Sequence, residues 1–478
     1  TTYVRPVTFF MSAVDSSTKV DENLYSRQIL LYGMEMMGRL TQLRVLVVGL
    51  GGVGVEVAKN LILAGPKAVT IADDGVVEAT DLASNYYLNE AHVGTTTRAS
   101  ASVKQLSQLN PYVAVDEHCG AVTEELVSQF NVVVFTRTPR DQLVRFNEFC
   151  RSHSPRITFV AADVFGAAGM LFSDFGDHFM VKDKRGEAPK QGLIADVSKG
   201  KPATVMLVGG KRNPMEVGEW VKFTEVKGMT ELNEQGPFRV TGVSQFGFDI
   251  EDTTGFADYV EGGRFEQVFV PEEFSHKSLR HRIVCPRVVG EMLNPELAKP
   301  GRPEQLHVAL QGLFGFWSRH GMLPTPHDEA HVAEVLQCAA EFAEENKKAN
   351  EGSSEFAGQA LVVDAVDASL VRAVARVAAA QFPPMCAFIG GLAAQEAIKA
   401  TGKYTPLDQW LLVDMLDALP DSLTGLGAAE VGAVDAAEVA PCGGRDADLV
   451  RLLGRSTVDK LHSLRVFLVG AGALGCEF

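Results

Sequence analysis

The stretch Arg44–Gly65, RVLVVGLGGVGVEVAKNLILAG, decides the fold. It opens with an apolar run suited to a buried strand, passes through the glycines of Gly49–Gly54 and ends with apolar residues three and four positions apart. This order predicts a strand, a tight turn and a helix. Glycines in such a turn let a phosphate approach the backbone closely, and the start of the following helix offers unpaired N–H groups to an anion.

Strand-like and helix-like segments continue to alternate beyond this stretch. Buried-strand patterns occur at Val69–Ala72, Val132–Phe135 and Thr158–Ala161, and a helical pattern occupies Arg98–Leu109. Strands that alternate with helices are typical of parallel sheets covered by helices. We therefore expect a Rossmann-like, doubly wound α/β domain over residues 21–198, preceded by an N-terminal extension over residues 1–20.

Two later segments interrupt the α/β pattern. Residues 199–275 show short alternating strands separated by Gly, Asn and Pro, which predicts a small antiparallel β-barrel. Residues 276–384 change to helical periodicity and predict a four-helix bundle. A helical and then a strand-like pattern over residues 385–422 returns the chain to the α/β domain, so the barrel and the bundle are insertions. An Ala- and Gly-rich linker is expected over residues 423–444.

An internal repeat changes the interpretation of the whole chain. Leu40–Glu56, LTQLRVLVVGLGGVGVE, recurs as Leu461–Glu477, LHSLRVFLVGAGALGCE, and Gly33 and Gly454 precede the two copies at the same offset. The sequence therefore encodes two Rossmann-like units. We expect residues 445–478 to be the start of the second unit, so that the chain is a fragment of a longer protein.

Composition narrows the classes of partner. The formal charge of −16 and a pI near 5.2 argue against a surface built to bind nucleic acid. No apolar run approaches the ~20 residues that span a membrane, and the first ten residues lack the core of a signal peptide. The seven cysteines are far apart, without a C-x-x-C pair or a cluster with His, so we expect reduced structural thiols, no metal site and an intracellular protein.

The glycine turn alone does not choose between classes of nucleotide-binding protein. A nicotinamide-dependent oxidoreductase also uses such a turn, with an acidic residue about twenty positions later to hold a ribose hydroxyl, and Asp73 or Asp74 fits that place. Tyr25–Gln28, YSRQ, lies on an amphipathic helical segment before the first strand, where a nicotinamide enzyme needs nothing. Arg27 in that segment is suited to reach a phosphate.

The sequence resembles a known family at these residues. Tyr25–Gly33, YSRQILLYG, together with the glycine turn and the acidic strand end, resembles the adenylating superfamily, which contains ubiquitin-activating enzymes and the adenylyltransferases of molybdopterin and thiamine sulfur carriers. Further segments are similar to the single-chain ubiquitin-activating enzymes, namely Phe223–Asn233, Phe256–Gly263, Arg302–His307 and Ala387–Ala400. The resemblance covers nearly all of the chain from Asn23 to Phe478.

The resemblance implies an ATP- and Mg²⁺-dependent ligase that activates ubiquitin or a ubiquitin-like protein. In that family the ubiquitin C-terminus is adenylated in the second, active domain. A cysteine in a later domain then takes the acyl group as a thioester, for delivery to ubiquitin-conjugating enzymes. The transfer cysteine and the domains that contact conjugating enzymes are thus expected outside this chain, which has no catalytic residue of its own. The family also implies a cytoplasmic and nuclear location.

The same resemblance assigns the ATP-binding residues. It implies that Arg27 extends across the domain interface and contacts the γ-phosphate of the ATP that the other domain binds. It also implies that the nucleotide-binding turn of the active domain contains Gly470, Gly472, Ala473 and Gly475.

The first copy departs from the active pattern. Active domains carry an Asn-Arg pair after the ribose-binding Asp, whereas Thr80–Leu88 has Ser84 near the arginine position and no basic residue. Arg98 lies near the site of a family lysine, and the second copy has Asp446–Leu449, DADL, opposite YSRQ. We therefore expect one active site, in the second domain, and an inactive first domain whose glycine turn and strand-end acids serve folding. This chain alone is expected to be inactive.

Two other functions remain open from the sequence. A non-catalytic subunit of a heterodimeric activator of another ubiquitin-like modifier would share the first domain, but it would stop before the repeat at Leu461. An NAD-dependent oxidoreductase explains Gly49–Gly54 and Asp73, but it explains neither Arg27 nor the barrel insertion.

Overall fold

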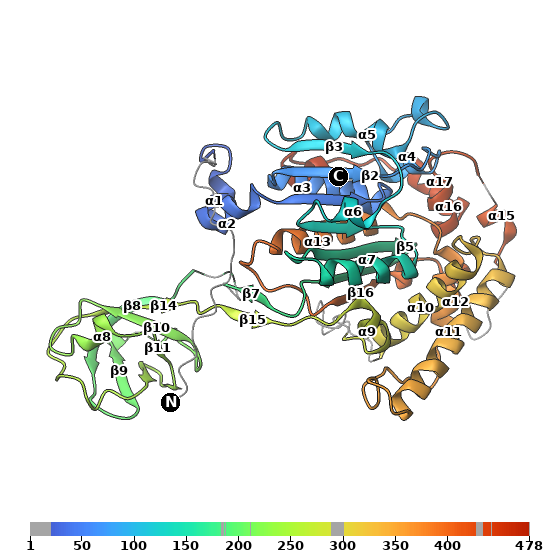
Figure 1. The fold of residues 1–478 in the computed structure, drawn as a ribbon. Coiled ribbons are helices and arrows are strands. Elements are labelled where there is room, and N and C mark those ends of the chain that lie inside the picture. Colours follow the sequence, from blue (N-terminus) through green and yellow to red (C-terminus); the bar gives the residue numbers. More distant parts are fainter. Residues whose placement is uncertain are drawn as a thin grey trace. The chain divides into compact units, whose positions relative to one another are not determined.

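The structure is a computed structural model that describes residues 21–182, 186, 188–210, 212–287, 301–426, 434–440 and 442–477. The expected N-terminal extension lies outside the described residues, as does part of the expected linker. The chain divides into two compact units (Figure 1). The smaller unit comprises His178–Phe274 and Gly402–Thr405, and the larger unit comprises the rest.

A seven-stranded sheet forms the centre of the larger unit. Its strand order is β16-β6-β5-β4-β1-β2-β3, in which β3, β2, β1, β4 and β5 run parallel and β6 is antiparallel to both neighbours. The bounds are β1 Arg44–Val48, β2 Ala68–Ala72, β3 Ala114–His118, β4 Val132–Phe135, β5 Thr158–Phe165, β6 Ala168–Asp174 and β16 Trp410–Asp414. Strands wound outward in both directions from β1 are the doubly wound arrangement, so the prediction of a Rossmann-like α/β fold is confirmed.

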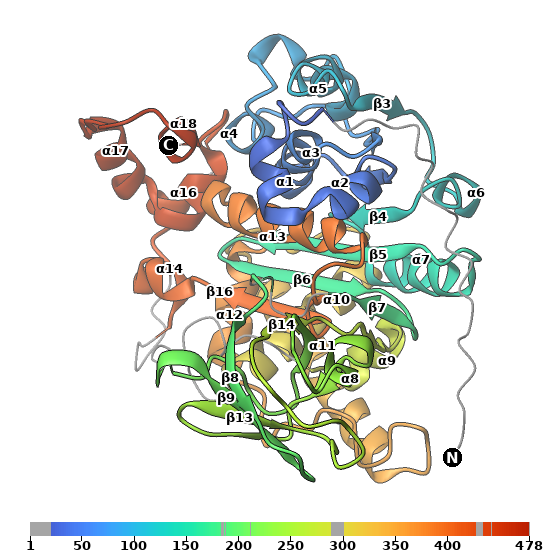
Figure 2. The ribbon, with the colours of Figure 1, turned by 90° about the vertical axis from the view of Figure 1, so that its left-hand side faces the viewer.

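The larger unit also contains helices, and several of them cover the sheet. Outside the insertions they are α1 (Ser26–Tyr32), α2 (Met34–Leu40), α3 (Gly52–Ala64), α4 (Asp81–Ser84), α5 (Arg98–Ser107), α6 (Glu124–Val127), α7 (Arg140–Ser152), α13 (Pro383–Lys399), α14 (Asp421–Thr424), α15 (Ala436–Val439), α16 (Ala447–Leu453), α17 (Arg455–Ser463) and α18 (Ala473–Glu477). Figure 2 shows α13 alongside α3 and against β5 and β6. Gly390 on α13 permits this approach, because a Cβ there would lie 2.5 Å from the Cβ of Glu56 on α3.

Apolar side chains pack on both faces of the central strands. Every residue of β4, β5 and β6 is buried, which explains why these strands are mostly apolar and do not alternate between apolar and polar residues. Phe135 of β4 stacks on Phe146 of α7 and on Phe159 of β5, with ring centroids 4.9 and 5.5 Å apart. The sheet therefore holds the rigid core that positions the loops at its carboxyl edge.

The helical insertion joins this core. Its helices are α9 (Leu279–Val284), α10 (Arg302–His320), α11 (Glu329–Glu351) and α12 (Ala368–Val377). Asp328 and Asp367 cap α11 and α12 by accepting hydrogen bonds from backbone N–H groups. Phe314 of α10 meets Phe165 of β5 edge to face, and both belong to one apolar cluster, so the helices extend the core of the α/β fold. Within the described ranges, no helix combines the length and the apolar character required to cross a membrane.

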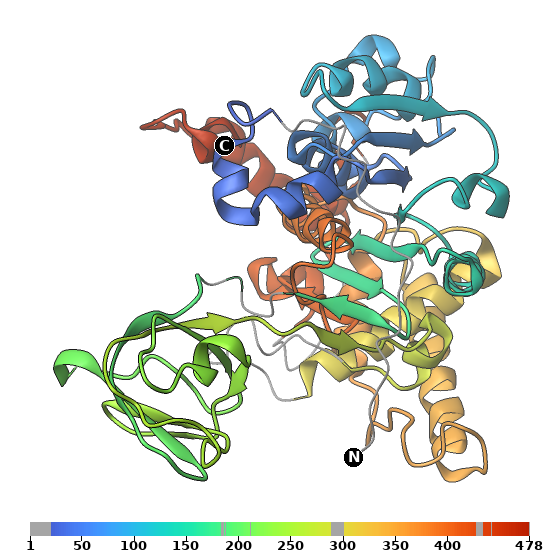
Figure 3. The same ribbon diagram turned by 60° about the vertical axis from the view of Figure 1, so that its left-hand side comes forward.

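The smaller unit is a curled antiparallel sheet (Figure 3). Its strand order is β11-β10-β14-β8-β9-β13-β12, with β8 Gln191–Val197, β9 Ala203–Leu207, β10 Trp220–Thr224, β11 Phe238–Arg239, β12 Gly242–Val243, β13 Gly247–Ile250 and β14 Arg264–Val268, and with helix α8 at Glu231–Glu234. The two end strands follow one another in the chain with only Val240 and Thr241 between them, so the sheet must curl until its edges meet. Phe223, Phe248 and Phe265 fill the inside.

This unit begins earlier than the boundary at residue 199. Strand β7 (Phe179–Val181) pairs with β15 (Glu272–Phe274), and β8 also precedes residue 199. The pairing between β7 and β15 joins segments far apart in the sequence, and such long-range pairs leave no local signal.

Replacing Gly390 by alanine should destabilise the larger unit, because the new Cβ would press on the Glu56 Cβ, which is fixed to the backbone of α3. The expected loss is about 1–3 kcal/mol of unfolding free energy, measured by thermal or urea unfolding. Gly391→Ala is the matched control, since nothing lies within 4 Å of its Cβ position. Alanine there should be neutral or stabilise by roughly 0.5–1 kcal/mol. Equal effects of the two substitutions would contradict the close packing of α3 and α13.

Candidate functional site

The first glycine turn joins β1 to α3. Gly49 has a φ of 84°, and a Cβ at Gly54 would lie 1.9 Å from the carbonyl oxygen of Gly49. The hydroxyl of Thr136, which directly follows β4, lies 3.1 Å from the carbonyl oxygens of both Val48 and Gly49. Because no side chain fits at Gly54, the turn that the sequence predicts requires glycine there.

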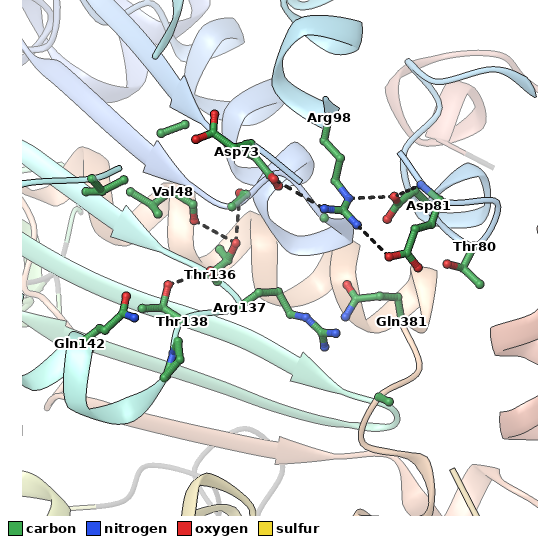
Figure 4. A pocket seen from close by; sticks show the side chains of 18 of the residues that line it. Val48, Asp73, Thr80, Asp81, Arg98, Thr136, Arg137, Thr138, Gln142 and Gln381 are labelled. Atoms are coloured by element: carbon green, nitrogen blue, oxygen red, sulfur yellow. Dashed lines mark hydrogen bonds and ion pairs between the residues drawn. The ribbon is translucent and has the colours of Figure 1, made fainter. Parts of the chain in front are cut away.

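A cavity of about 590 Å³ opens at the carboxyl ends of β1, β2 and β4 (Figure 4). Gly49 and Gly51 of the turn line one side of it. In open α/β sheets ligands bind at this edge, where the strand order reverses. An active copy of the fold would bind its nucleotide here.

The acids at the end of β2 are engaged by the backbone. Asp73 accepts hydrogen bonds from the N–H of Leu50 at 2.6 Å and from the N–H of Gly75 at 2.8 Å. Asp74 accepts hydrogen bonds from the N–H of Gly120 at 2.9 and 3.2 Å. Both carboxylates therefore fix the loops around the cavity.

Three carboxylates surround Arg98, the first residue of α5 (Figure 4). Its Nε lies 2.8 Å from Asp81, and its other guanidinium nitrogens lie 3.5 Å from Asp73 and 3.9 Å from Glu78. Burial disfavours the charged form, but the charges of Asp81 and Asp73 outweigh burial and raise the pKa of Arg98 above its ordinary value. A guanidinium already balanced by acids attracts a phosphate weakly.

Sequence reasoning missed Arg137, which follows β4 and lines the cavity. Its φ of 50° is uncommon for a residue with a side chain, and its N–H donates to Asp163 at 2.9 Å. Figure 4 shows the side chain of Arg137 extending toward Gln381. Asp163 is 1% exposed and also accepts the N–H of Val164, and burial raises the pKa of its carboxyl to about 6. The place directly after a central parallel strand was the available signal for Arg137.

The second copy of the repeat reaches into the first cavity. Helix α16 contributes Asp448 and Arg451 to the lining. Asp448 is 3% exposed, accepts a hydrogen bond from the N–H of Gln381 at 2.8 Å and pairs with Arg451 at 2.7 Å. A carboxylate from the second copy is thus fixed in the wall of the first cavity.

The two copies share backbone geometry as well as sequence. Gly33 and Gly454, which end α1 and α16, both have a φ of 80°, with ψ of 159° and 152°. Gly470 has a φ of 92°, and a Cβ at Gly475 would lie 2.0 Å from the carbonyl oxygen of Gly470. The second glycine turn therefore has the same local conformation as the first.

The strand before the second turn is absent from the described part of the chain. Val45 and Leu46 of β1 are at most 1% exposed. Their counterparts Val466 and Phe467 are 84% and 90% exposed and lie outside any strand. The second turn thus lacks the sheet that completes a cavity around the first turn.

The predicted site residues fall into two groups. The first group, Gly470, Gly472, Ala473 and Gly475, lies together in the second turn and the start of α18. Arg27 lies on the exposed surface of α1, and in the described part of the chain no carboxylate pairs with it. At the offset of the repeat, the counterpart of Arg27 is Asp448. The sequence had indicated only that this position lacks an arginine.

The sheet, the glycine turn and the edge cavity define an α/β fold of the nucleotide-binding type. The ThiF family profile matches residues 25–417, and the chain belongs to that family. The chain is 40% identical over 468 residues to ubiquitin-like modifier-activating enzyme 1 of Oryctolagus cuniculus, covering 98% of this chain and 42% of that protein. The Homo sapiens protein of the same name is 39% identical with the same coverage, and ubiquitin-activating enzyme E1 2 of Arabidopsis thaliana is 39% identical, covering 97% of this chain and 41% of that protein.

These relatives confirm the resemblance to ubiquitin-activating enzymes. The chain spans less than half the length of each of them. A crystal structure of E. coli MccB with succinimide overlaps 31% of this chain and 47% of that chain at 19% identity, with a TM-score of 0.28, and contributes nothing to the assignment.

Asp163 should make the stability of the larger unit depend on pH. Its folded-state pKa of about 6 lies above the ordinary value of about 4, so the native state holds the proton more tightly than the unfolded chain. This contribution is complete below about pH 4 and is lost as the pH rises through about 6. The unfolding free energy of Asp163→Asn relative to the wild type should therefore rise by about 2 kcal/mol between pH 4 and pH 7.

Urea unfolding at a series of pH values measures this difference. Asp116→Asn, at an exposed position on β3, controls for the loss of a carboxylate. A difference between Asp163→Asn and wild type that stays constant with pH would contradict the buried environment of Asp163.

Proposed function

We propose that this chain is part of a ubiquitin-activating enzyme and supplies its inactive adenylation half. In this proposal the complete enzyme adenylates the C-terminus of ubiquitin, or of a ubiquitin-like protein, with ATP and then forms a thioester. Support comes from the ThiF family match, from relatives named as activating enzymes that align with nearly the whole chain, and from the two glycine turns.

The observation that carries the proposal is the position of Asp448. Helix α16 of the second copy places this residue in the cavity of the first copy. Two copies of one fold that pair about a two-fold axis make reciprocal contacts, so α1 of the first copy should reach the cavity of the second copy in the same way. Arg27 is the counterpart of Asp448 and would then line the second cavity, beside Gly470–Gly475.

The exposed surfaces of α1 and α16 support this pairing of the two copies. Four residues of α16 are buried against the larger unit, whereas no residue of α1 is buried. Leu30 of α1 is 89% exposed, and Leu24, which precedes the helix, is 52% exposed. An apolar surface of this kind on a helix is suited to pack on a further domain. We infer that this domain is the completed second copy.

The chemistry explains why an arginine is useful at that position. The carboxylate of the substrate attacks the α-phosphorus of ATP, the bond to the β-phosphate oxygen breaks, and pyrophosphate leaves with its negative charge. Oriented N–H groups of the glycine turn and the guanidinium of Arg27 would stabilise that charge as it develops. Mg²⁺ would accompany ATP and be held by the phosphates and by residues beyond this chain. Within the described ranges, no three His, Cys, Asp or Glu side chains are grouped as a metal ion requires.

The first cavity receives a carboxylate, and not an arginine, from the other copy at this position. Asp448 stands where the reciprocal contact would place an arginine, and Arg98 is already paired with Asp81 and Asp73. Asp448 is itself paired with Arg451, and Arg137 also lines this cavity, so in this proposal the two sites differ by the arginine that α16 does not supply. The interface between the copies would therefore serve one ATP site.

The proposed enzyme passes ubiquitin to conjugating enzymes through domains beyond this chain, and it works in the cytoplasm and the nucleus. A non-catalytic subunit of a heterodimeric activator is the second candidate. The formed turn at Gly470–Gly475 argues against it, because such a subunit has no use for a second glycine turn. An NAD-dependent oxidoreductase is less well supported, since Asp73 already accepts two backbone N–H groups and pairs with Arg98.

This chain alone should show no ubiquitin-dependent exchange of pyrophosphate into ATP, because the sheet around the second turn is incomplete. The measurement is incorporation of labelled pyrophosphate into ATP, with and without ubiquitin. An enzyme that continues beyond the second turn serves as the positive control. Detectable exchange by this chain would place the active site in the first copy and refute the proposed division of labour.

In the longer enzyme, Arg27→Ala should lower the rate of adenylation by about 10²–10³-fold, because the guanidinium acts on charge that develops in the transition state. The melting temperature should not change, since Arg27 is exposed. Arg372→Ala, at an exposed position on α12, controls for the loss of a surface arginine. Equal rates for Arg27→Ala and Arg372→Ala would refute the role of Arg27.

A further inference from the structure

Lys59 lies between the two copies of the repeat, outside the cavity. It belongs to α3, and its side chain is 8% exposed. Its ammonium lies 2.9 Å from Oε2 of Glu56 and 2.8 Å from Oε2 of Glu477. The hydroxyl of Tyr86 lies 3.4 Å from the ammonium and donates a hydrogen bond to Oε1 of Glu56. These four residues, called the Lys59 cluster below, connect α3 to α18.

The two carboxylates of the cluster occupy the same position in the repeat. Glu56 is the last residue of the repeated segment Leu40–Glu56 and follows Gly54 by two positions, and Glu477 stands in the same relation to Gly475 in Leu461–Glu477. One lysine therefore receives a carboxylate from each glycine-turn helix. Such equivalent contacts are expected close to an axis that relates two copies of a fold. The cluster thus lies where the glycine-turn helices of the two copies contact each other.

Lys59 keeps its positive charge and separates the two carboxylates of the cluster. Burial works against the charge of Lys59, but hydrogen bonds to Glu477 and Glu56 outweigh burial and raise the pKa of Lys59 above its ordinary value. Burial and Glu56 raise the pKa of Tyr86, so the phenol keeps its proton and remains a donor. Without the ammonium, the buried carboxylate of Glu56 would lie next to the half-exposed carboxylate of Glu477 with no positive charge between them.

We propose that Lys59 is a positioning residue that holds the second glycine turn in register against α3. Glu477 ends α18, and α18 starts within the turn that begins at Gly470. A fixed Glu477 therefore fixes the direction in which the N–H groups of the turn point. The consequence for catalysis rests on the proposed function, namely that this turn binds ATP. The contact itself does not depend on that function.

Hydrogen exchange in this chain tests the contact directly. Glu477→Gln removes one charge at a side chain that is 57% exposed, so the fold should survive. The amides of residues 473–477 should then exchange about tenfold faster, because the helix loses its link to α3. Lys104→Met, at an exposed position on α5, should leave this exchange unchanged. Unchanged exchange in Glu477→Gln would overturn the proposal.

A charge swap separates positioning from a general loss of stability. The double variant Lys59→Glu with Glu477→Lys keeps one ammonium between two carboxylates, with the lysine now supplied by α18. Exchange of residues 473–477 should return to within about threefold of wild type, whereas Lys59→Glu alone should exchange faster than Glu477→Gln. A double variant that exchanges as fast as Lys59→Glu alone would overturn the proposal.

Kinetics in the longer enzyme test the catalytic consequence. Glu477→Gln should raise the KM for ATP in ubiquitin-dependent pyrophosphate exchange by about tenfold and leave the KM for ubiquitin within about twofold, because only the ATP turn shifts. Lys59→Arg, which keeps the charge, should stay close to wild type. An unchanged KM for ATP beside accelerated hydrogen exchange would overturn the catalytic role. A wild-type enzyme that shows no ubiquitin-dependent pyrophosphate exchange would refute the proposed function instead. The hydrogen-exchange results would still show whether Lys59 holds α18 in place.

Discussion

A backbone oxygen that leaves no room for a side chain sets the geometry of both copies of the repeat. A Cβ at Gly54 would lie 1.9 Å from the carbonyl oxygen of Gly49, and a Cβ at Gly475 would lie 2.0 Å from that of Gly470. This contact lets a strand pass into a helix within a few residues and points the start of the helix at the carboxyl edge of the sheet. The first copy has the sheet, the cavity and the covering helices around its turn, while the described part of the second copy has the turn and the helices that precede it.

Charge, more than shape, distinguishes the two halves. The first cavity keeps the place that a nucleotide would occupy, but its acids hold Arg98 and the backbone, and Asp448 enters from the second copy. The reciprocal residue on α1 is Arg27, which is exposed and has no carboxylate partner in the described ranges. In the proposed enzyme, these side chains would allow one of two similar folds to bind a polyphosphate and not the other.

Local sequence patterns predicted the elements but not the long-range contacts. The run RVLVVG predicted β1, and the repeat placed the second glycine turn at Gly470–Gly475, because strands, turns and sequence copies leave signals within a short window. The start of the barrel unit at His178 depends on the pairing between β7 and β15. The packing of the helical insertion on the sheet depends on the contact between Phe314 and Phe165. Neither has a local signal.

Some features of the candidate site could likewise be predicted from the sequence, and others could not. The resemblance to the adenylating family implied that Thr80–Leu88 lacks the basic residue of an active domain. It did not indicate that Arg98 would be surrounded by three acids or that Arg137 would line the cavity, because both depend on how distant segments meet. It also recorded Asp448 only as a missing arginine, whereas the structure gives this carboxylate a fixed place in the first cavity.

A structure of the longer enzyme with a non-hydrolysable ATP analogue tests the one-sided site most directly. One nucleotide is expected, bound at Gly470–Gly475, with its γ-phosphate within hydrogen-bonding distance of the Arg27 guanidinium and with the first cavity free of nucleotide. A nucleotide bound against Gly49–Gly54, or an Arg27 directed away from the phosphates, would contradict the account. In that account the first copy contributes only Arg27, and the second copy binds ATP.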